Sequence, residues 1–376
     1  MRTICLLAGL CAALVLANRC AAGTSRGKVV LVRAIGDAPG AQSDVFEKDL
    51  DTGKTTLLIS HKSLPKAFSG RIGHAWPSPS RRYMLLTGWW CWDRKTGTVR
   101  RVASEVGSSS QWAPRTDRLL IRDWGSESRQ GSLWLYDPST GRSRSMGSVR
   151  QLDLAGWSGH GDGIIVVTCR EKGLSTVYFQ PITGERKRLF TWNGPMEAVE
   201  QSPVGSHFAI FDGKRYWLTD ARGRKPANLE IPAGEHGSSR FGVDFLFNRR
   251  GDKLALFTSD TYGEPHFGLM KRLWWVDVER KRPHLIAEWD ESVRGGLEAP
   301  RPAGTAESRQ VEGWLDDTSL VVSGRVIHWV GGDAEERSDW HKLWVYRAVS
   351  GAQGREVFDS GKRCLDAAWW PGLARK

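Results

Sequence analysis

The chain has 376 residues, with 54 lysine and arginine residues against 42 aspartate and glutamate residues, and a formal net charge of +12. Hydrophobic residues make up 40% of it and charged residues 26%, a balance that excludes a wholly disordered chain. Because single hydrophobic cores stop growing near ~250–300 residues, this length requires several domains or a repeat architecture. The 42 glycine and 19 tryptophan residues favour short strands and turns over helix bundles.

The amino-terminal segment has the pattern of a secretory signal peptide. Arg2 precedes an apolar or small run over residues 4–16, and Cys20-Ala21-Ala22 follows it. A charged start, an apolar centre and a small-residue exit are typical of such peptides, and the run is shorter than the ~18 residues of a membrane span. We therefore expect residues 1–22 to be a signal peptide and residues 23–376 to reach the periplasm or the cell exterior. No other segment approaches a transmembrane span.

Three cysteines, Cys91, Cys169 and Cys364, remain after removal of the signal peptide. They are scattered, and no Cys-x-x-Cys pair exists for zinc or redox chemistry. The pattern predicts buried small apolar residues, and it leaves open whether two of them form a disulfide.

A first repeated element consists of an aromatic residue, a polar turn and an apolar run. Its copies start at Trp76, Trp112, Trp157, Gln201 (without the aromatic) and Phe247, spaced by 36, 45, 44 and 46 residues. A sixth copy starts at residue 314. These spacings are typical of the four-stranded blades of β-propellers.

A second repeated element lies between the copies of the first. An apolar and aromatic strand ends in a polar turn, usually with glycine, as in Trp90–Gly97 and Leu133–Gly141. Seven such copies occur, and the copy at Leu273–Arg280 has lost its glycine. Glycine supplies the positive φ that such a tight turn needs.

Together the two elements predict blades with four strands, called A, B, C and D from first to last. Residues Lys28–Ser60 supply strands B, C and D without an A strand, and Cys364–Gly372 supply an A strand alone. We therefore expect an all-β fold, a single seven-bladed β-propeller over residues 23–376. The carboxyl-terminal strand would pair with the amino-terminal blade and close the ring without a free edge.

These repeats resemble those of the TolB-like, WD-like β-propeller family, and the resemblance covers essentially all of the mature chain. It implies protein–protein contacts in the bacterial envelope. We therefore expect an exported protein-interaction or ligand-binding module rather than an enzyme, because a compact cluster of histidines on inner strands is missing. The alternative is a propeller enzyme that acts on anionic carbohydrate, a lyase or hydrolase assisted by a metal, since some similar propellers cleave anionic sugars with a metal held by histidines.

The long connections predict where a binding surface lies. In a propeller the A–B and C–D turns lie on one face and the B–C and D–A connections on the other. The A–B and C–D turns are short, whereas long connections are expected at residues 123–131 in blade 3, 259–268 in blade 6, 288–310 between blades 6 and 7, and 324–341 in blade 7. The candidate binding residues combine aromatic, histidine and acidic side chains: Tyr262, His266, His328, Trp329, Asp339, Trp340 and His341.

No motif assigns a catalytic residue or a cofactor. The sequence has no His-Glu-x-x-His pair, no phosphate-binding glycine loop and no Gly-x-Ser-x-Gly elbow. A divalent metal enters only under the enzyme alternative. The positive charge of an exported monomer favours an envelope protein or an anionic glycan as partner over nucleic acid.

Overall fold

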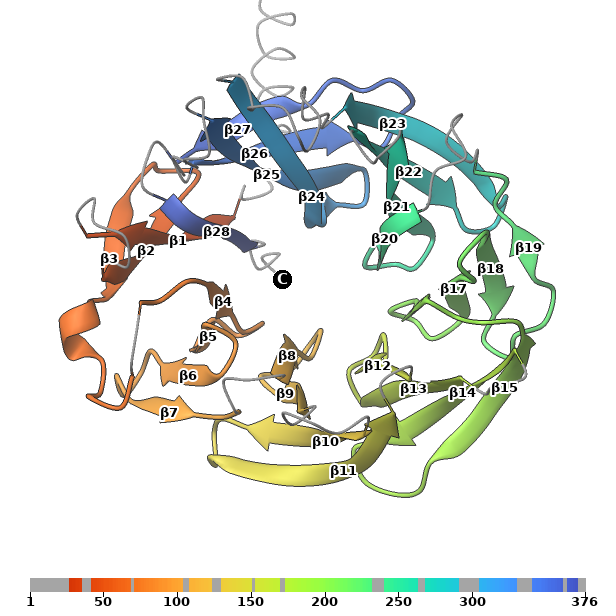
Figure 1. Cartoon of the computed structure of the whole chain (residues 1–376), viewed down its shortest axis with the longest axis horizontal. Coiled ribbons are helices and arrows are strands. Elements are labelled where there is room, and N and C mark those ends of the chain that lie inside the picture. The colour runs from red at the N-terminus through yellow and green to blue at the C-terminus, as the bar shows by residue number, and fades with distance from the viewer. Residues whose placement is uncertain are drawn as a thin grey trace, which may run out of the picture.

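The computed structural model is a ring of seven four-stranded antiparallel sheets around a central channel (Figure 1). It describes residues 27–35, 42–68, 71–103, 108–123, 130–150, 153–169, 173–231, 240–262, 268–290, 304–329, 340–360 and 364–370. The predicted seven-bladed, all-β propeller is confirmed. The predicted signal peptide, residues 1–22, lies outside the described residues.

Each blade runs from an inner strand beside the channel to an outer strand at the rim (Figure 1). Blade 1 comprises β28 (Cys364–Trp370), β1 (Lys28–Ala34), β2 (Ser43–Asp49) and β3 (Thr55–Ile59). Blade 2 comprises β4 (Ala75–Pro77), β5 (Tyr83–Leu86), β6 (Trp90–Asp93) and β7 (Val99–Arg101). Blade 3 comprises β8 (Ser108–Trp112), β9 (Leu119–Asp123), β10 (Gln130–Asp137) and β11 (Arg142–Arg150). Blades 4 and 5 comprise β12 (Leu154–Trp157), β13 (Gly163–Cys169), β14 (Leu174–Pro181) and β15 (Lys187–Asn193); and β16 (Ala198–Gln201), β17 (His207–Phe211), β18 (Tyr216–Asp220) and β19 (Ala227–Asn228). Blades 6 and 7 comprise β20 (Arg240–Phe247), β21 (Lys253–Tyr262), β22 (Gly268–Asp277) and β23 (Arg282–Asp290); and β24 (Gly304–Asp316), β25 (Ser319–Trp329), β26 (Trp340–Arg347) and β27 (Arg355–Asp359). One short 3-10 helix, η1 (His61–Ser63), follows β3.

The ring closes at blade 1, as predicted from the sequence. β28 is the inner strand of that blade and pairs antiparallel with β1, with Lys28 opposite Trp370 and Val32 opposite Asp366. Two ends of the chain that are far apart in sequence therefore build one sheet, and the inner edge of β1 is covered.

The hydrophobic core consists of seven layers, one between each pair of neighbouring blades. A central strand faces a neighbouring blade on both sides, so its apolar residues run without alternation; all four residues of β5 are buried. Three of the repeated tryptophans link neighbouring blades by hydrogen bonds near the channel. The indole nitrogens of Trp112, Trp157 and Trp314 donate to the inner-strand carbonyl oxygens of Trp76, Gln111 and Leu246 in the preceding blade, at 2.8–2.9 Å.

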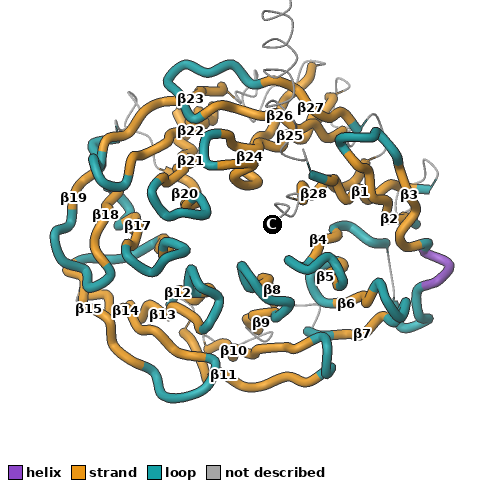
Figure 2. The backbone as a smooth tube through the Cα atoms, turned by 180° about the vertical axis from the view of Figure 1, so that it is seen from behind, coloured by secondary structure: helices purple, strands orange, loops and turns teal. Residues whose placement is uncertain are grey.

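Four of the A–B turns, those of blades 2, 4, 5 and 6, are each built around one buried polar side chain. Ser78, Ser158, Ser202 and Asn248 occupy the same position, just after the inner strand, and all are almost completely buried. The Ser202 hydroxyl accepts the backbone N–H groups of Ser206 and His207, both at 3.1 Å. Figure 2 shows these turns as loops around the channel.

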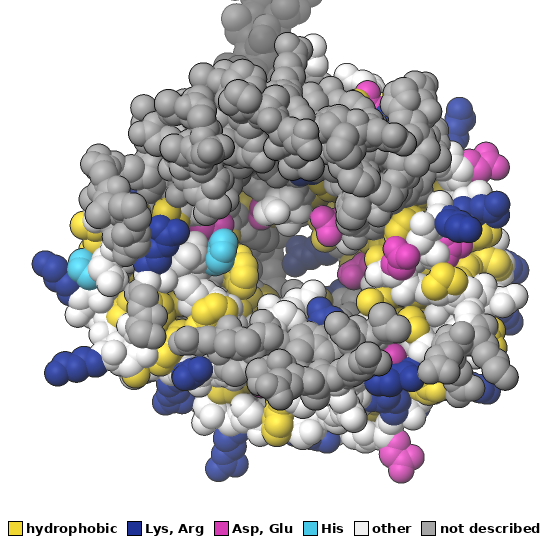
Figure 3. Space-filling view, in the orientation of Figure 1, with side chains coloured by type: hydrophobic (Ala, Val, Ile, Leu, Met, Phe, Trp, Pro, Cys, Tyr) yellow, Lys and Arg dark blue, Asp and Glu magenta, His cyan; other side chains and the backbone are white. Residues whose placement is uncertain are grey.

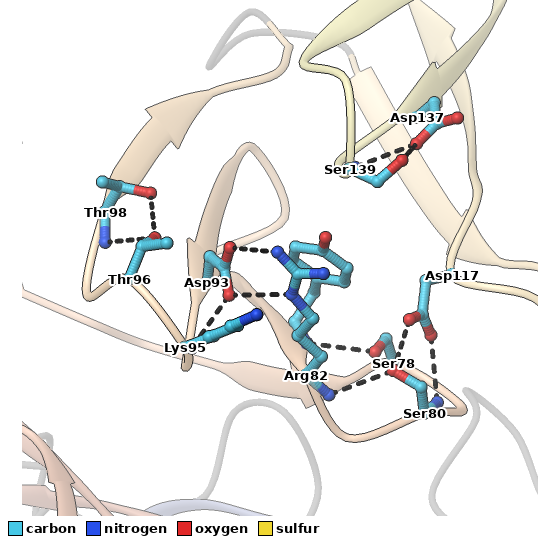
Figure 4. Close-up of polar contacts among 11 residues, drawn as sticks. Ser78, Ser80, Arg82, Asp93, Lys95, Thr96, Thr98, Asp117, Asp137 and Ser139 are labelled. Atoms are coloured by element: carbon cyan, nitrogen blue, oxygen red, sulfur yellow. Dashed lines mark hydrogen bonds and ion pairs between the residues drawn. The ribbon is translucent and has the colours of Figure 1, made fainter.

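Five of the seven C–D turns, those of blades 1, 2, 3, 5 and 6, depend on an aspartate and a residue in the left-handed conformation. In blade 2, Asp93 accepts hydrogen bonds from the backbone N–H of Lys95 and from Nε and Nη2 of Arg82 (Figure 4). The Arg82 hydrogen bonds are the main reason that the pKa of Asp93 is held below its usual range. Gly97 follows at φ 72°, which confirms the predicted use of glycine. In blade 6 the lost glycine is replaced by Lys281 at φ 56°, a conformation that strains a residue with a side chain.

The cysteines and the apolar segments agree with a propeller that needs no cross-link. Cys91 and Cys364 are buried, Cys169 is half-buried, and all three are free thiols. The part of the chain that the structure describes contains no apolar helix of membrane-spanning length.

Candidate functional site

Only one of the seven predicted binding residues has a described side chain. His341 is buried, with 8% of its surface exposed, and its backbone exchanges hydrogen bonds with Ser360. Its side chain therefore lies within blade 7. The backbones of Tyr262, His328, Trp329 and Trp340 lie at strand ends, and His266 and Asp339 lie outside the described residues. The binding surface predicted at these residues stays a prediction.

The long connections of blades 6 and 7 are shorter than expected, because the strands that flank them are longer than most strands of the other blades. β21 reaches Tyr262 and β22 begins at Gly268, while β25 reaches Trp329 and β26 begins at Trp340. The prediction of loops over 259–268 and 324–341 is therefore wrong in extent, and so is that over 288–310, since β24 begins at Gly304. The physical reason is that ladder pairing, such as Val326 with Trp340, satisfies the backbone polar groups of these segments.

A pocket of about 570 Å³ opens on the face of the B–C and D–A connections, beside the channel at blades 2 and 3. We call it the rim pocket. Its volume lies within the ~300–1,000 Å³ typical of small-molecule sites. The D–A segment before β4 supplies Arg71 and His74, β4 supplies Trp76, and the B–C turn of blade 2 supplies Trp89. Figure 3 shows this face of the ring, with the channel open at its centre.

The aromatic wall of the rim pocket is ordered by its neighbours. The ring of His74 stacks on Trp76, with centroids 5.5 Å apart and planes 11° apart. The Nδ1 atom of His74 lies 3.5 Å from Oδ2 of Asp366, which also accepts the backbone N–H of Ala75. Asp366 belongs to the closing strand β28, so ring closure helps to orient the pocket. Trp76 nevertheless remains 38% exposed, which is unusual for so large an apolar side chain.

The pocket exists because the B–C connection of blade 2 is only a tight turn. Thr87 and Gly88 have φ values of 50° and 90°, and the N–H of Trp89 donates to the carbonyl of Leu86. Two consecutive residues with positive φ are typical of a type I′ hairpin turn. A β-branched residue in this region is strained, and such strain gathers at functional sites.

A second hollow, of about 300 Å³, lies between the inner strands of blades 6 and 7 and carries acidic groups. Burial raises the pKa of Glu312, although hydrogen bonds from Ser323 and Gln310 counteract this. Burial also raises the pKa of Asp244, and the charge of Lys271 opposes it. Burial therefore favours the neutral form of both carboxyl groups in this hollow.

The described residues include no group of three histidine, cysteine, aspartate or glutamate side chains placed to hold a metal ion. Of the candidate binding histidines, His266 lies in a segment that the structure does not describe. The sequence analysis missed the rim pocket, because it searched for long connections and this pocket arises at a short one. The available signal was the tryptophan pair Trp89-Trp90 directly after the turn residues Thr87-Gly88.

Comparisons with known proteins define the class of this chain through its fold. No family model matches the chain, and no curated protein matches its sequence. Among solved structures, it is similar to a candidate 6-phosphogluconolactonase from Bacteroides uniformis at 12% identity and a TM-score of 0.50, over 92% of this chain and 99% of that one. It is also similar to TolB from Acinetobacter baumannii (15% identity, TM-score 0.41, 73% of this chain and 65% of that one) and to the WD40 domain of SCAP from fission yeast (10% identity, TM-score 0.47, 90% and 85%).

The fold thus makes the chain a seven-bladed β-propeller. The matched region spans 65% of the length of the Acinetobacter baumannii TolB. At 12% identity, the likeness to the Bacteroides uniformis protein concerns the fold alone and carries no statement about ligand or activity.

Proposed function

We propose that this chain is an exported β-propeller that acts as a binding module in the bacterial envelope, with the rim pocket as its binding site. One observation carries the proposal: the exposed Trp76 lies in a pocket with a second tryptophan, a histidine and an arginine. Exposed aromatic and arginine side chains are the residues that dominate binding energy at protein surfaces.

The chemistry of the pocket defines the ligand that suits it. The tryptophan faces offer flat apolar contact area, Arg71 offers a positive charge, and Arg71 and His74 both offer hydrogen-bond donors. An anionic glycan presents both features, with sugar C–H faces for the indoles and carboxylates for the guanidinium. An acidic segment of an envelope protein presents them less regularly.

The experiment is a capture assay with residues 23–376 immobilised. Acidic oligosaccharides, their neutral reduced forms and an envelope extract are passed over the wild type and over Trp76→Ala and Arg71→Gln. We expect acidic oligosaccharide to be retained by the wild type, and each variant to weaken its binding about tenfold or more.

Trp134→Ala is the matched control, because Trp134 is 37% exposed and does not line the pocket. It should bind like the wild type. Equal losses in Trp134→Ala and Trp76→Ala would mean that the rim pocket is not the site. Retention of a protein from the extract with no glycan binding would keep the site and change its ligand.

A further inference from the structure

A third pocket lies in the channel wall, where the inner strands of blades 3, 4 and 5 meet. Its volume is about 200 Å³. The wall is apolar over Leu154, Trp157, Ile165 and Val199, and it contains two charged residues, Arg122 and Glu200. We call it the channel-wall pocket. It shares no residue with the rim pocket, so its function is independent of the function proposed above.

Arg122 lies at one side of this pocket. It is two residues after Leu120 in β9, and Leu120 packs in the core layer between blades 3 and 4, so both side chains face blade 4. Arg122 is half-buried, and within the described part of the chain no carboxylate lies within ion-pair distance of it. Burial lowers the pKa of its guanidinium, yet an arginine remains charged at any physiological pH. The pocket therefore holds a positive charge without a counter-ion from the described residues.

Glu200 lies on the other side, in the inner strand β16 of blade 5. Among the described residues, no lysine or arginine forms an ion pair with it. Burial raises the pKa of Glu200 to about 8, so most of this carboxyl is protonated near neutral pH and has an O–H to donate. The pocket thus combines one full positive charge, one neutral hydrogen-bond donor and an apolar wall.

We propose that the channel-wall pocket binds a small monocarboxylate with an apolar body, whose carboxylate pairs with the Arg122 guanidinium while its body packs against Leu154 and Trp157. The planar guanidinium matches a carboxylate through two parallel hydrogen bonds. A monoanion balances the single charge of the site, whereas a phosphate dianion leaves one charge uncompensated. The volume is below the ~300 Å³ lower end for drug-sized ligands, which selects a small molecule or a terminal residue.

The unpaired charge of Arg122 also predicts how its replacement affects the stability of the protein without ligand. A charge that is removed from water without a partner destabilises the fold, and a binding site keeps it for its ligand. Replacement of Arg122 by an uncharged residue should therefore leave the melting temperature of the free protein unchanged or raise it. A purely structural arginine would behave in the opposite way.

The test uses isothermal titration calorimetry on residues 23–376 with phenylacetate as the probe. Phenylacetamide is its neutral counterpart, and a short peptide ending in phenylalanine is used with a free and an amidated carboxyl terminus. We expect saturable binding of phenylacetate or of the free-acid peptide, and none of either amide. Binding of the peptide acid alone would identify a chain terminus as the source of the carboxylate.

Variants make the result specific. Arg122→Gln should weaken binding of the acid about tenfold or more, and Arg122→Leu should abolish it without a lower melting temperature. The control Arg188→Gln changes an exposed arginine on the outer strand β15 and should bind like the wild type. The proposal is overturned if neither acid binds, if Arg122→Gln binds like the wild type, or if both Arg122 variants melt markedly earlier. If the channel-wall pocket does not bind a carboxylate, the proposal for the rim pocket is unaffected, because Trp76→Ala and Arg71→Gln are measured with a different ligand.

Discussion

The two faces of the ring use short turns for opposite purposes. On the face of the A–B and C–D turns, most turns hydrogen-bond to their own side chains, as Asn248 does with the N–H groups of Asp252 and Lys253. On the other face, the short turn at Thr87 and Gly88 leaves the surface low and opens a pocket beside it. A short connection therefore closes the structure on one face and opens a site on the other. Substitutions on the first face should change stability, and those on the second should change binding.

The closing strand is common to both faces, and its removal should have the largest effect. Deletion of residues 364–376 uncovers the inner edge of β1 and removes Cys364, Ala367 and Trp369 from the core layer between blades 7 and 1. We expect the cooperative thermal transition to disappear in calorimetry. Deletion of residues 371–376 alone is the control and should melt like the full chain. A cooperative melt near the wild-type temperature without residues 364–376 would refute closure by this strand.

The next effect concerns Glu47, which joins blades 1 and 2. Its carboxylate lies 2.6 Å from Nζ of Lys28 and 3.1 Å from Nη1 of Arg94, and it is 5% exposed. Burial would raise the pKa of Glu47, but the hydrogen bond from Lys28 and the charges of Arg94 and Lys28 hold it below the usual 4.5. Glu47→Gln should lower the free energy of unfolding by about 2 kcal/mol at pH 7, less than a fully buried pair because both cations are partly exposed.

The pH dependence of this variant has a definite sign. A carboxyl whose pKa is lowered by folding stabilises the protein above its unfolded pKa, and this stabilisation is lost as the pH falls through the folded pKa. Urea titrations should therefore show that the difference between wild type and Glu47→Gln is full at pH 7 and shrinks below about pH 4.5. A difference that stays constant down to pH 3 would show that the ion pairs do not contribute.

Asn248→Ala tests the turn face directly. The side chain is fully buried, and its loss leaves the N–H groups of Asp252 and Lys253 without their acceptor. We expect a loss of about 1–3 kcal/mol in urea unfolding, with binding at the rim pocket unchanged. Ser80→Ala is a milder control, since Ser80 is exposed and its bonds to Asp117 are in water. If Asn248→Ala impaired binding while folded, the division between the two faces would fail.

The smallest effect is a gain. Lys281 occupies the place in the C–D turn of blade 6 that Gly97 occupies in blade 2, and both residues donate their N–H to the aspartate four positions earlier. Lys281→Gly should raise the free energy of unfolding by about 0.5–1 kcal/mol, because relief of the positive φ exceeds the entropy cost of glycine. Gly97→Lys should do the reverse. Equal stability of all three proteins would show that φ does not limit these turns.

The fold was predictable because its signals are local and repeated. Tryptophans at the start of each unit and glycines at the C–D turns, such as Gly97, recur in register and need no knowledge of distant contacts. The leftover strands at the two ends then required closure at blade 1, and the pairing of β28 with β1 confirmed it.

The sites were less predictable, because they depend on how separate blades meet. Arg71, Trp76 and Trp89 come together only when three segments of the ring are placed side by side. Arg122 and Glu200 lie two blades apart, and nothing in either local sequence indicates that they line one pocket. Loop length was a poor guide as well, because part of the long segments of blades 6 and 7 extends the strands instead.

The buried thiol of Cys364 makes the opening of the closing strand measurable by chemical labelling. It is fully buried in β28, and burial raises its pKa to about 12, so the reactive thiolate is almost absent in the closed ring. Cys91 is a second buried thiol, in β6 of blade 2, and burial raises its pKa to about 12 as well. A thiol reagent should label the two cysteines under native conditions only when their surroundings open. The two labelling rates would therefore report separately how often the pairing of β28 with β1 opens and how often blade 2 opens.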